Sequence, residues 1–361
     1  MAIMQLVQRL APGGLETMAL ALGQQLSNQQ PVLLVSLEGS TESLLAQWPA
    51  LAAGNPVIGL EKGSGFDWQL VRQLRQLCAE HQIRWLHSHH IGPLLYGALA
   101  CAGSRTRQLH SHHDGWHLAD RKDRWLTRWL LRCGGAASVA VAEQVAATLS
   151  AQGCRVDRVI ANGVDANRFR PRSQSAMRQR LGLGDDLWLF GAVARMVPVK
   201  QLQLLVEALP SLPRQAQLLL AGDGPCRPQL QQLANDLGVA ERCHFLGHCD
   251  QPQYLYPALD CYCLCSKAEG APMALWEAQS SGVPVLCADV GNCRANLCPD
   301  SGRIVAADQW PQALWQQMQQ QSAQTAQQPA VAPAARAFAL AHGSLLPMAS
   351  GYQQLMQEIE R

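Results

Sequence analysis

Two glutamates, Glu269 and Glu277, are separated by seven residues that include Gly270 and Pro272. Glycine permits a tight turn, and proline suits the start of a helix. The pattern predicts that Glu269 lies in a loop after a strand and that Glu277 lies about a turn and a half inside the next helix. Ligands bind at such strand-to-helix junctions of α/β sheets. The pair could therefore act as acid and base, or it could accept hydrogen bonds from hydroxyl groups.

Two cations follow another predicted strand, Leu187–Ala194. Arg195 comes directly after this strand, and Lys200 stands five residues later. At the end of a strand, such a pair can hold a diphosphate and stabilise the charge of a leaving group. The alternative is two solvated surface charges, and their fixed place after the strand favours the anion site.

Two glycine-rich turns follow predicted strands. Gly13 and Gly14 come after the first strand and open a helix, whose N-terminal N–H groups could bind a phosphate, although an ordinary turn is the alternative. Gly222 and Gly224 follow a strand in the second half of the chain. A dinucleotide fingerprint would need a third glycine where the chain has Arg227, so we expect a loop near a nucleotide instead.

Histidines gather at the ends of two predicted strands of the first half. They are His87, His89, His90, His110, His112 and His113. We expect a polar, hydrogen-bonding site at this sheet edge, because a crevice lies there in parallel sheets. Zinc is the competing interpretation, but no carboxylate or cysteine completes an obvious ligand set.

These motifs together resemble the E-x7-E signature of glycosyltransferase family 4, the retaining enzymes with the GT-B fold. The residues that fill the family's frame are Ser266, Glu269, Gly270, Pro272, Glu277, Ala278, Gly282, Pro284 and Val285. The cation pair and both glycine turns fill further places, so the resemblance spans nearly the whole chain, from Gly13 to Tyr352. One loop departs from the family, with Asn292 and Ala295 where it has Gly and Glu, which leaves the donor sugar open.

The resemblance implies an α/β protein with two Rossmann-like domains that face each other across a cleft. The alternation of predicted strands and helices agrees with this expectation. We expect residues 1–168 to form the acceptor-side domain and residues 169–344 to form the nucleotide-sugar domain, with Asn167–Asp186 as a linker. Residues 345–361 are expected to form a helix that packs back on the first domain.

The implied activity is retaining transfer of a sugar from a UDP- or GDP-sugar to a hydroxyl of a glycan or lipid-linked acceptor. Lipopolysaccharide, capsule or exopolysaccharide biosynthesis is the expected context. A sugar-nucleotide epimerase of the same fold and a non-catalytic sugar-nucleotide-binding scaffold are the alternatives. We expect no cofactor and no metal, because the chain lacks an Asp-x-Asp pair.

The resemblance also implies roles for individual residues. Glu269 faces the transferred sugar, Glu277 binds the ribose hydroxyls, and Arg195 and Lys200 neutralise the leaving diphosphate. The first-domain active-site histidine is expected to be His113, with His112 as the alternative on the acceptor side and His89 as a second acceptor-side candidate. The other residues expected around the nucleotide sugar are Gly13, Gly14, Gly222, Gly224, Gly270, Ala271, Pro272, Met273 and Ala274.

The formal net charge of +2 argues against nucleic acid as a partner. No apolar run is long enough to span a bilayer, and no secretion signal is recognisable at the start, so we expect a cytoplasmic location. The segment Arg121–Arg132 combines arginines at helical spacing with Trp125 and Trp129. It could lie on anionic lipid at the inner face of the plasma membrane, but a solvated helix with its apolar stripe toward its own core is the preferred interpretation.

Overall fold

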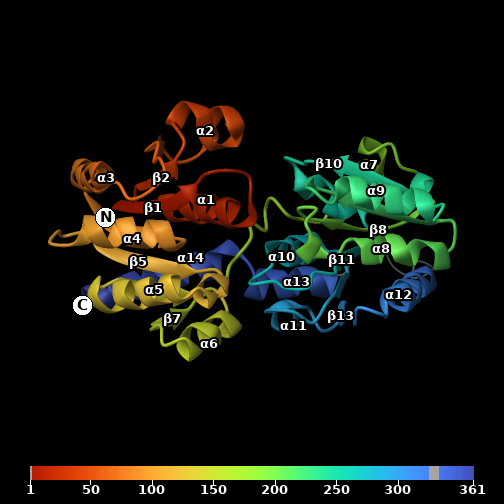
Figure 1. Cartoon of the computed structure of the whole chain (residues 1–361). Coiled ribbons are helices and arrows are strands. Elements are labelled where there is room, and N and C mark those ends of the chain that lie inside the picture. Colours follow the sequence, from red (N-terminus) through yellow and green to blue (C-terminus); the bar gives the residue numbers. More distant parts are fainter. Residues whose placement is uncertain (1, 325–332) are drawn as a thin grey trace. The chain divides into compact units, whose positions relative to one another are not determined.

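The computed structural model describes residues 2–324 and 333–361, which form two compact units (Figure 1). The first unit comprises Met1–Gly163 together with Leu345–Arg361, and the second comprises Val164–Ser344. Each unit is a parallel β-sheet covered by helices, as the alternating sequence pattern predicts. The chain therefore has the expected α/β architecture of two Rossmann-like domains.

The first unit is built on a seven-stranded parallel sheet in the order β3-β2-β1-β4-β5-β6-β7. Its strands are β1 (Ala2–Arg9), β2 (Val32–Glu38), β3 (Val57–Gly59), β4 (Ile83–His89), β5 (Arg107–His112), β6 (Ala137–Ala140) and β7 (Arg158–Val159). The strand order reverses between β1 and β4, which is where ligands bind in open α/β sheets.

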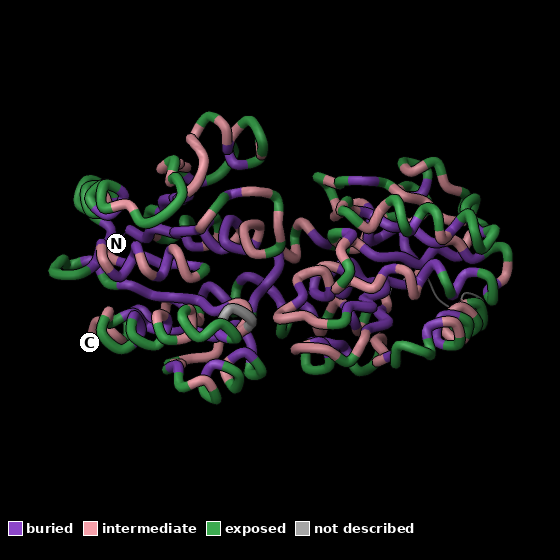
Figure 2. The backbone as a smooth tube through the Cα atoms, viewed as in Figure 1, coloured by how far each residue is buried: buried purple, intermediate pink, exposed green. Residues whose placement is uncertain are grey.

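The helices of the first unit cover its sheet and leave the central strands almost fully buried (Figure 2). They are α1 (Gly14–Ser27), α2 (Thr41–Gln47), α3 (Trp68–Glu80), α4 (Ile91–Cys101), α5 (Arg121–Cys133), α6 (Glu143–Ala151) and α14 (Leu345–Glu360). Strands buried on both faces read as continuous apolar runs, as in the Val32–Val35 part of β2.

The last helix, α14, belongs to the first unit although it follows the second in the chain. The Tyr352 hydroxyl lies 2.7 Å from Ser111 Oγ in the buried sheet. Glu360 accepts hydrogen bonds from Arg84 Nε and Trp85 Nε1, both at 3.0 Å. These contacts fix α14 against β4 and β5.

The second unit is built on a six-stranded parallel sheet in the order β10-β9-β8-β11-β12-β13. Its strands are β8 (Trp188–Val193), β9 (Ala216–Ala221), β10 (Cys243–Gly247), β11 (Cys261–Leu264), β12 (Val285–Cys287) and β13 (Gly302–Ile304). Its helices are α7 (Gln174–Arg180), α8 (Gln203–Ala208), α9 (Arg227–Asp236), α10 (Met273–Ser280), α11 (Cys293–Asn296), α12 (Trp310–Gln324) and α13 (Pro333–His342). None of the helices in the described part of the chain is long and apolar enough to cross a bilayer.

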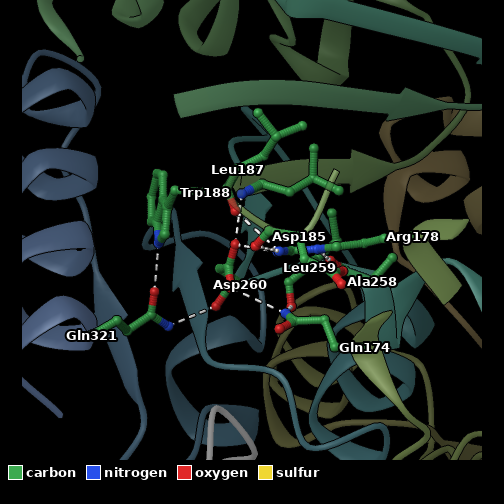
Figure 3. A network of polar contacts seen from close by, with 10 residues as sticks. Gln174, Arg178, Asp185, Leu187, Trp188, Ala258, Leu259, Asp260 and Gln321 are labelled. Carbon is green, nitrogen blue, oxygen red and sulfur yellow. Dashed lines mark hydrogen bonds and ion pairs between the residues drawn. The ribbon is translucent and has the colours of Figure 1, made fainter. Parts of the chain in front are cut away.

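The stretch Asn167–Asp186 is not a linker, contrary to the sequence-based expectation. It contains α7, whose Arg178 is buried and lies 2.6 Å from Asp260 Oδ2 (Figure 3). The Arg178 guanidinium also donates to the Ala258 and Leu187 carbonyls, at 3.1 and 3.0 Å. An arginine can be buried when its charge and donors are satisfied in this way, so a polar sequence forms part of the second unit.

The first unit ends at Gly163 rather than at residue 168. Val164 already belongs to the second unit, because its N–H donates to the Gly343 carbonyl at 2.8 Å and it forms a parallel bridge with Ser344. The two places where the chain passes between the units are therefore adjacent.

Candidate functional site

The sequence-predicted residues of the second unit lie at the carboxyl ends of four neighbouring strands. Arg195 and Lys200 follow β8, Gly222 follows β9, Glu269 follows β11, and the altered loop that begins near Asp289 follows β12. The strand order reverses between β8 and β11, so the cations and Glu269 stand at a switch point of the sheet.

Lys200 and Glu269 form an ion pair, with 2.5 Å between Nζ and Oε1. The Glu269 side chain is only 10 % exposed, and its Oε1 also accepts a hydrogen bond from Ser266 Oγ at 2.5 Å. The two loops are joined by their backbones, because Lys267 N–H donates to the Val199 carbonyl at 2.8 Å. Lys200 uses one of its three N–H donors here, which leaves donors for an anion.

Glu277 lies inside α10, and its Oε2 accepts a hydrogen bond from the Tyr256 hydroxyl at 2.6 Å. Burial raises the pKa of Glu277, while the Tyr256 hydrogen bond and the charge of Arg168 act in the opposite direction. Tyr256 is fully buried, so it holds the carboxylate in one position. The second oxygen of Glu277 can accept hydrogen bonds from a ligand.

The loop between the two glutamates leads directly into the N-terminus of α10. This helix begins at Met273, with Pro272 as its N-cap, whereas the sequence pattern placed Pro272 at the first helical position. Gly270, Ala271 and Ala274 lie beside this N-terminus, where the first N–H groups have no partner within the helix. Such an end favours negative charge.

The two glycines after β9 allow their loop to contact the segment after β8. Gly222 has φ +127°, and a Cβ atom there would lie 2.0 Å from the Ala194 carbonyl oxygen. A Cβ atom at Gly224 would lie 2.4 Å from the Met196 carbonyl oxygen. Between these contacts stands Arg195, whose exposed side chain makes no hydrogen bond or ion pair within residues 2–324 and 333–361. Its guanidinium is available to a ligand.

The loop that departs from the family pattern packs against the Glu269 loop. Gly291 has φ +54°, and a Cβ atom there would lie 2.0 Å from the Glu269 carbonyl oxygen. Asn292 N–H donates to the Gly270 carbonyl at 3.3 Å. The glycine that this chain retains thus keeps the β12 loop close to Glu269, while the Asn292 side chain bonds to Asn296.

In the first unit, Gly13 is the N-cap of α1 and Gly14 is its first residue. A Cβ atom at Gly13 would lie 2.5 Å from Glu16 Oε2, so glycine leaves room for this carboxylate. Burial raises the pKa of Glu16. The predicted glycine turn therefore exists, and it carries a partly buried carboxyl group beside the helix N-terminus.

The histidine cluster is mostly internal to the first sheet. His87 and His89 are fully buried, and His112 is 2 % exposed. His89 bonds His113 Nε2 at 3.0 Å and Gln5 Oε1 at 2.8 Å, so its ring is held inside the sheet. His89 and His112 were expected on the acceptor side, and the structure buries both within the first unit. His113 is partly buried, and burial lowers its pKa to about 3, which keeps it neutral.

Within the described residues, no group of three histidine, cysteine, aspartate or glutamate side chains could hold a metal ion. The histidines bond to polar neighbours instead, as His87 Nε2 does to Ser111 Oγ at 2.7 Å. A hydrogen-bonded cluster of neutral imidazoles explains why several histidines can share one sheet edge.

A pocket of about 650 Å³ opens in the first unit at the switch point between β1 and β4. It is lined by Gln8, Arg9, Glu16, Lys62, Gly65, Phe66, His90, Ile91, Gly92, Leu95 and Tyr96. His90 belongs to the histidine cluster expected at this sheet edge, and Glu16 follows the predicted Gly13–Gly14 turn, whereas Phe66 and Tyr96 were not assigned to a site from the sequence. The sequence did contain one signal for this pocket. Phe66 follows a glycine-rich polar loop, and an aromatic residue in such a loop is more often exposed than part of the core.

Two family models match the chain, one for each unit. The model described as Glycosyltransferase Family 4 matches residues 12–168, and the model described as Glycosyl transferases group 1 matches residues 173–336. Among curated proteins, D-inositol 3-phosphate glycosyltransferase of Nocardia farcinica is 36% identical over 163 residues, 42% of this chain and 36% of the relative. The putative glycosyltransferase EpsF of Bacillus subtilis is 30% identical over 183 residues, 48% of each chain. The chain thus spans less than half the length of these relatives.

Solved structures resemble the chain over its whole length. Anabaena HepE in complex with UDP has a TM-score of 0.84 at 22% identity, with 99% of this chain and 100% of that chain covered. WaaG, described as a glycosyltransferase involved in lipopolysaccharide biosynthesis, has a TM-score of 0.71 at 16% identity, with 99% of each chain covered. These likenesses establish the fold.

Proposed function

The chain belongs to glycosyltransferase family 4 and has the GT-B fold, and from this premise we propose that it transfers a sugar from a nucleotide-diphosphate sugar to an acceptor hydroxyl. The transfer proceeds with retention at the anomeric carbon, without a metal or cofactor. The observation that carries this proposal is the Lys200–Glu269 ion pair at the switch point of the second sheet.

In the proposed reaction, Lys200 and Arg195 neutralise the diphosphate as its bond to the sugar breaks. Such preorganised charge stabilises a leaving group without reorganisation during the reaction. The departing phosphate oxygen takes the proton of the acceptor hydroxyl, whose oxygen forms the new bond on the same face of the sugar. Glu269 binds the transferred sugar, and Glu277, fixed by Tyr256, accepts hydrogen bonds from the ribose hydroxyls.

The first unit contributes the acceptor side and His113. This histidine is neutral and partly buried, so it can exchange a hydrogen bond with a sugar hydroxyl without bringing charge to the site. Gly13 and Gly14 offer the N-terminus of α1 to the donor phosphates.

UDP- or GDP-sugars are the proposed donors. The Anabaena HepE structures contain UDP and, in one case, UDP with glucose, and one curated relative from Corynebacterium glutamicum is a GDP-mannose-dependent mannosyltransferase. The description of WaaG as involved in lipopolysaccharide biosynthesis supports a role in cell-surface polysaccharide biosynthesis. A cytoplasmic location and a glycan or lipid-linked acceptor belong to the same proposal. No observation favours an epimerase or a non-catalytic scaffold.

A peripheral membrane contact through α5 completes the proposal. Leu130 and Leu131 face the core, in agreement with a solvated helix whose apolar stripe points inward, while Trp125 and Trp129 are 66% and 46% exposed. Five of its exposed residues recur at helical spacing: Arg121, Trp125, Arg128, Trp129 and Arg132. We call them the α5 face. Exposed tryptophans between arginines suit the interface of an anionic bilayer.

The proposal is tested by incubating the purified protein with UDP-, GDP- and ADP-sugars and measuring release of the nucleoside diphosphate. Turnover of one donor, and its loss in Lys200→Ala, is the expected result. A wild-type protein that neither binds nor turns over any donor contradicts the proposed function.

A further inference from the structure

The pocket of the first unit contains an exposed aromatic ring that is held in place. Phe66 is 49% exposed, and its ring stacks on Tyr96 at 5.4 Å with an interplanar angle of 6°. Tyr96 is buried, and its hydroxyl accepts a hydrogen bond from Asp67 N–H at 2.9 Å, one residue beyond Phe66. The loop therefore fixes Phe66 instead of leaving it mobile. We call the Phe66–Tyr96 stack the aromatic ledge.

A fixed and exposed aromatic face suits a flat ligand with an apolar side. One face of a pyranose ring presents C–H groups, and these pack on the apolar body of an aromatic ring. Because the ledge is already in position, little conformational entropy is lost on binding. A pocket of about 650 Å³ has room for one or two sugar rings.

Two cations lie in the same pocket. Lys62 Nζ donates to the Gly63 carbonyl at 2.8 Å and stands 5.9 Å from the centre of the Tyr96 ring, so its position is tied to the ledge. Arg9 is exposed at the end of β1 and makes one hydrogen bond, from Nη2 to Gln47 Oε1 at 3.3 Å. Both side chains keep donors for an anionic group.

The remaining polar groups suit sugar hydroxyls. Glu16 lines the pocket, and its partly buried carboxyl group can bind a sugar hydroxyl. His90 adopts φ 71° and ψ 163°, a conformation that glycine alone adopts readily. Strain of this kind is concentrated at binding and catalytic sites, and here it puts His90 on the pocket wall.

We propose that this pocket binds a hexose ring carrying a negatively charged group, with the ring on the aromatic ledge and the charge at Lys62 and Arg9. The bound sugar is the acceptor of the proposed transfer, so the acceptor role rests on the proposed function. Hexose phosphates and uronic acids are both anionic hexoses, so the negatively charged group can be a phosphate or a carboxylate.

The test measures binding of small probes to the full chain by isothermal titration calorimetry, with saturating UDP present to occupy a diphosphate site. The probes are glucose 6-phosphate, glucuronic acid, glucose and inorganic phosphate. A charge-assisted hydrogen bond predicts that at least one anionic hexose binds about tenfold more tightly than glucose or phosphate. Binding of the phosphate ester alone assigns a phosphosugar, and binding of glucuronic acid alone assigns a uronic acid.

Two variants with matched controls distinguish the contribution of the aromatic ledge to binding from the contribution of the cation. Phe66→Ala should weaken the anionic hexose about tenfold, while Trp315→Ala, an exposed tryptophan of α12 in the second unit, should not. Lys62→Ala should remove the preference for the anionic hexose over glucose, and Lys62→Arg should restore part of this preference. The control Lys122→Ala, on α5, should leave the preference unchanged.

Equal binding of glucose and both anionic hexoses overturns the proposal, as does unchanged affinity in Phe66→Ala. These outcomes are distinguishable from failure of the proposed function. Absence of UDP binding and donor turnover contradicts the transferase proposal while the hexose titration still reports on the pocket. Retained donor turnover with no hexose selectivity contradicts the pocket proposal alone.

Discussion

The Lys200 ammonium lies 2.5 Å from the Glu269 carboxylate although the two residues follow different strands, β8 and β11. Each therefore sets the charge around the other. In the free protein, Glu269 holds Lys200 in place, and a bound diphosphate would share the ammonium with it. One ion pair thus links the leaving group to the residue proposed to face the sugar.

Removal of the Lys200 ammonium should act mainly on the chemical step. We expect Lys200→Ala to lower kcat by about 10²- to 10³-fold, the usual effect of losing one preorganised charge-stabilising donor. Lys267→Ala is the control, because Lys267 is exposed and joins the same loops through its backbone alone. Steady-state kinetics on the donor found in the panel would measure both. Equal losses of kcat in the two variants would contradict the assignment of Lys200 as the residue that neutralises the leaving diphosphate.

The close approach of Gly291 to Glu269 can be tested with a single methyl group. Gly291→Ala places Cβ 2.0 Å from the Glu269 carbonyl oxygen, so the β12 loop must move away. We expect a loss of about 1–3 kcal/mol in the free energy of unfolding and weaker donor binding. Gly238→Ala is matched, because Gly238 has φ +66° and open space around its Cβ position. If the two variants lose equal stability and both bind donor normally, backbone strain alone explains the result.

The buried histidines should make the first unit sensitive to acid. Burial lowers the pKa of His87 to about 3, so the unfolded chain binds a proton below pH 6.5 that the folded unit does not. The stability from this group is complete above pH 6.5 and declines as the pH falls toward 3, by about 1.4 kcal/mol for each pH unit. Hydrogen exchange of β4 amides between pH 7 and pH 4.5 would measure the decline.

His87→Gln should flatten this pH dependence, because glutamine keeps a hydrogen-bonding group near Ser111 but does not titrate. The control is His81→Gln, since His81 is exposed at the end of α3. An unchanged slope in His87→Gln would show that other groups cause the acid sensitivity.

The α5 face should bind anionic vesicles. Trp125 and Trp129 stack at 6.4 Å and both are exposed, so their replacement by alanine should leave folding intact. We expect the wild type to sediment with phosphatidylglycerol vesicles but not with phosphatidylcholine vesicles, and the double variant to lose about tenfold in affinity. Trp68→Ala, on α3, is the control. Wild-type protein that stays in the supernatant with both lipids would rule the contact out.

The sequence predicted the parts of the site that depend on backbone geometry. Gly222 and Gly224 were identifiable because only residues without Cβ allow their loop to approach β8 so closely. Glu269 and Glu277 were placed correctly in a loop and a helix, because Gly270 and Pro272 mark the boundary between them. These are local signals that a single chain segment carries.

Features that depend on contacts distant in sequence were not predictable. Arg178 looked like a linker charge, because its partner Asp260 is 82 residues away. The exposure of the α5 tryptophans was not predictable, because helical spacing does not tell which face the sheet covers. The pocket was missed because Phe66 and Tyr96 meet only in the folded unit.

The docking of α14 on the first sheet has a consequence for biogenesis. During synthesis, Ser111 and Trp85 leave the ribosome long before Tyr352 and Glu360, the residues of α14 that bond to them. These parts of β4 and β5 therefore stay uncovered by α14 while the entire second unit is translated. Chaperone dependence and aggregation during expression should therefore depend on α14, although this helix is remote in sequence from the loops that carry Lys200 and Glu269.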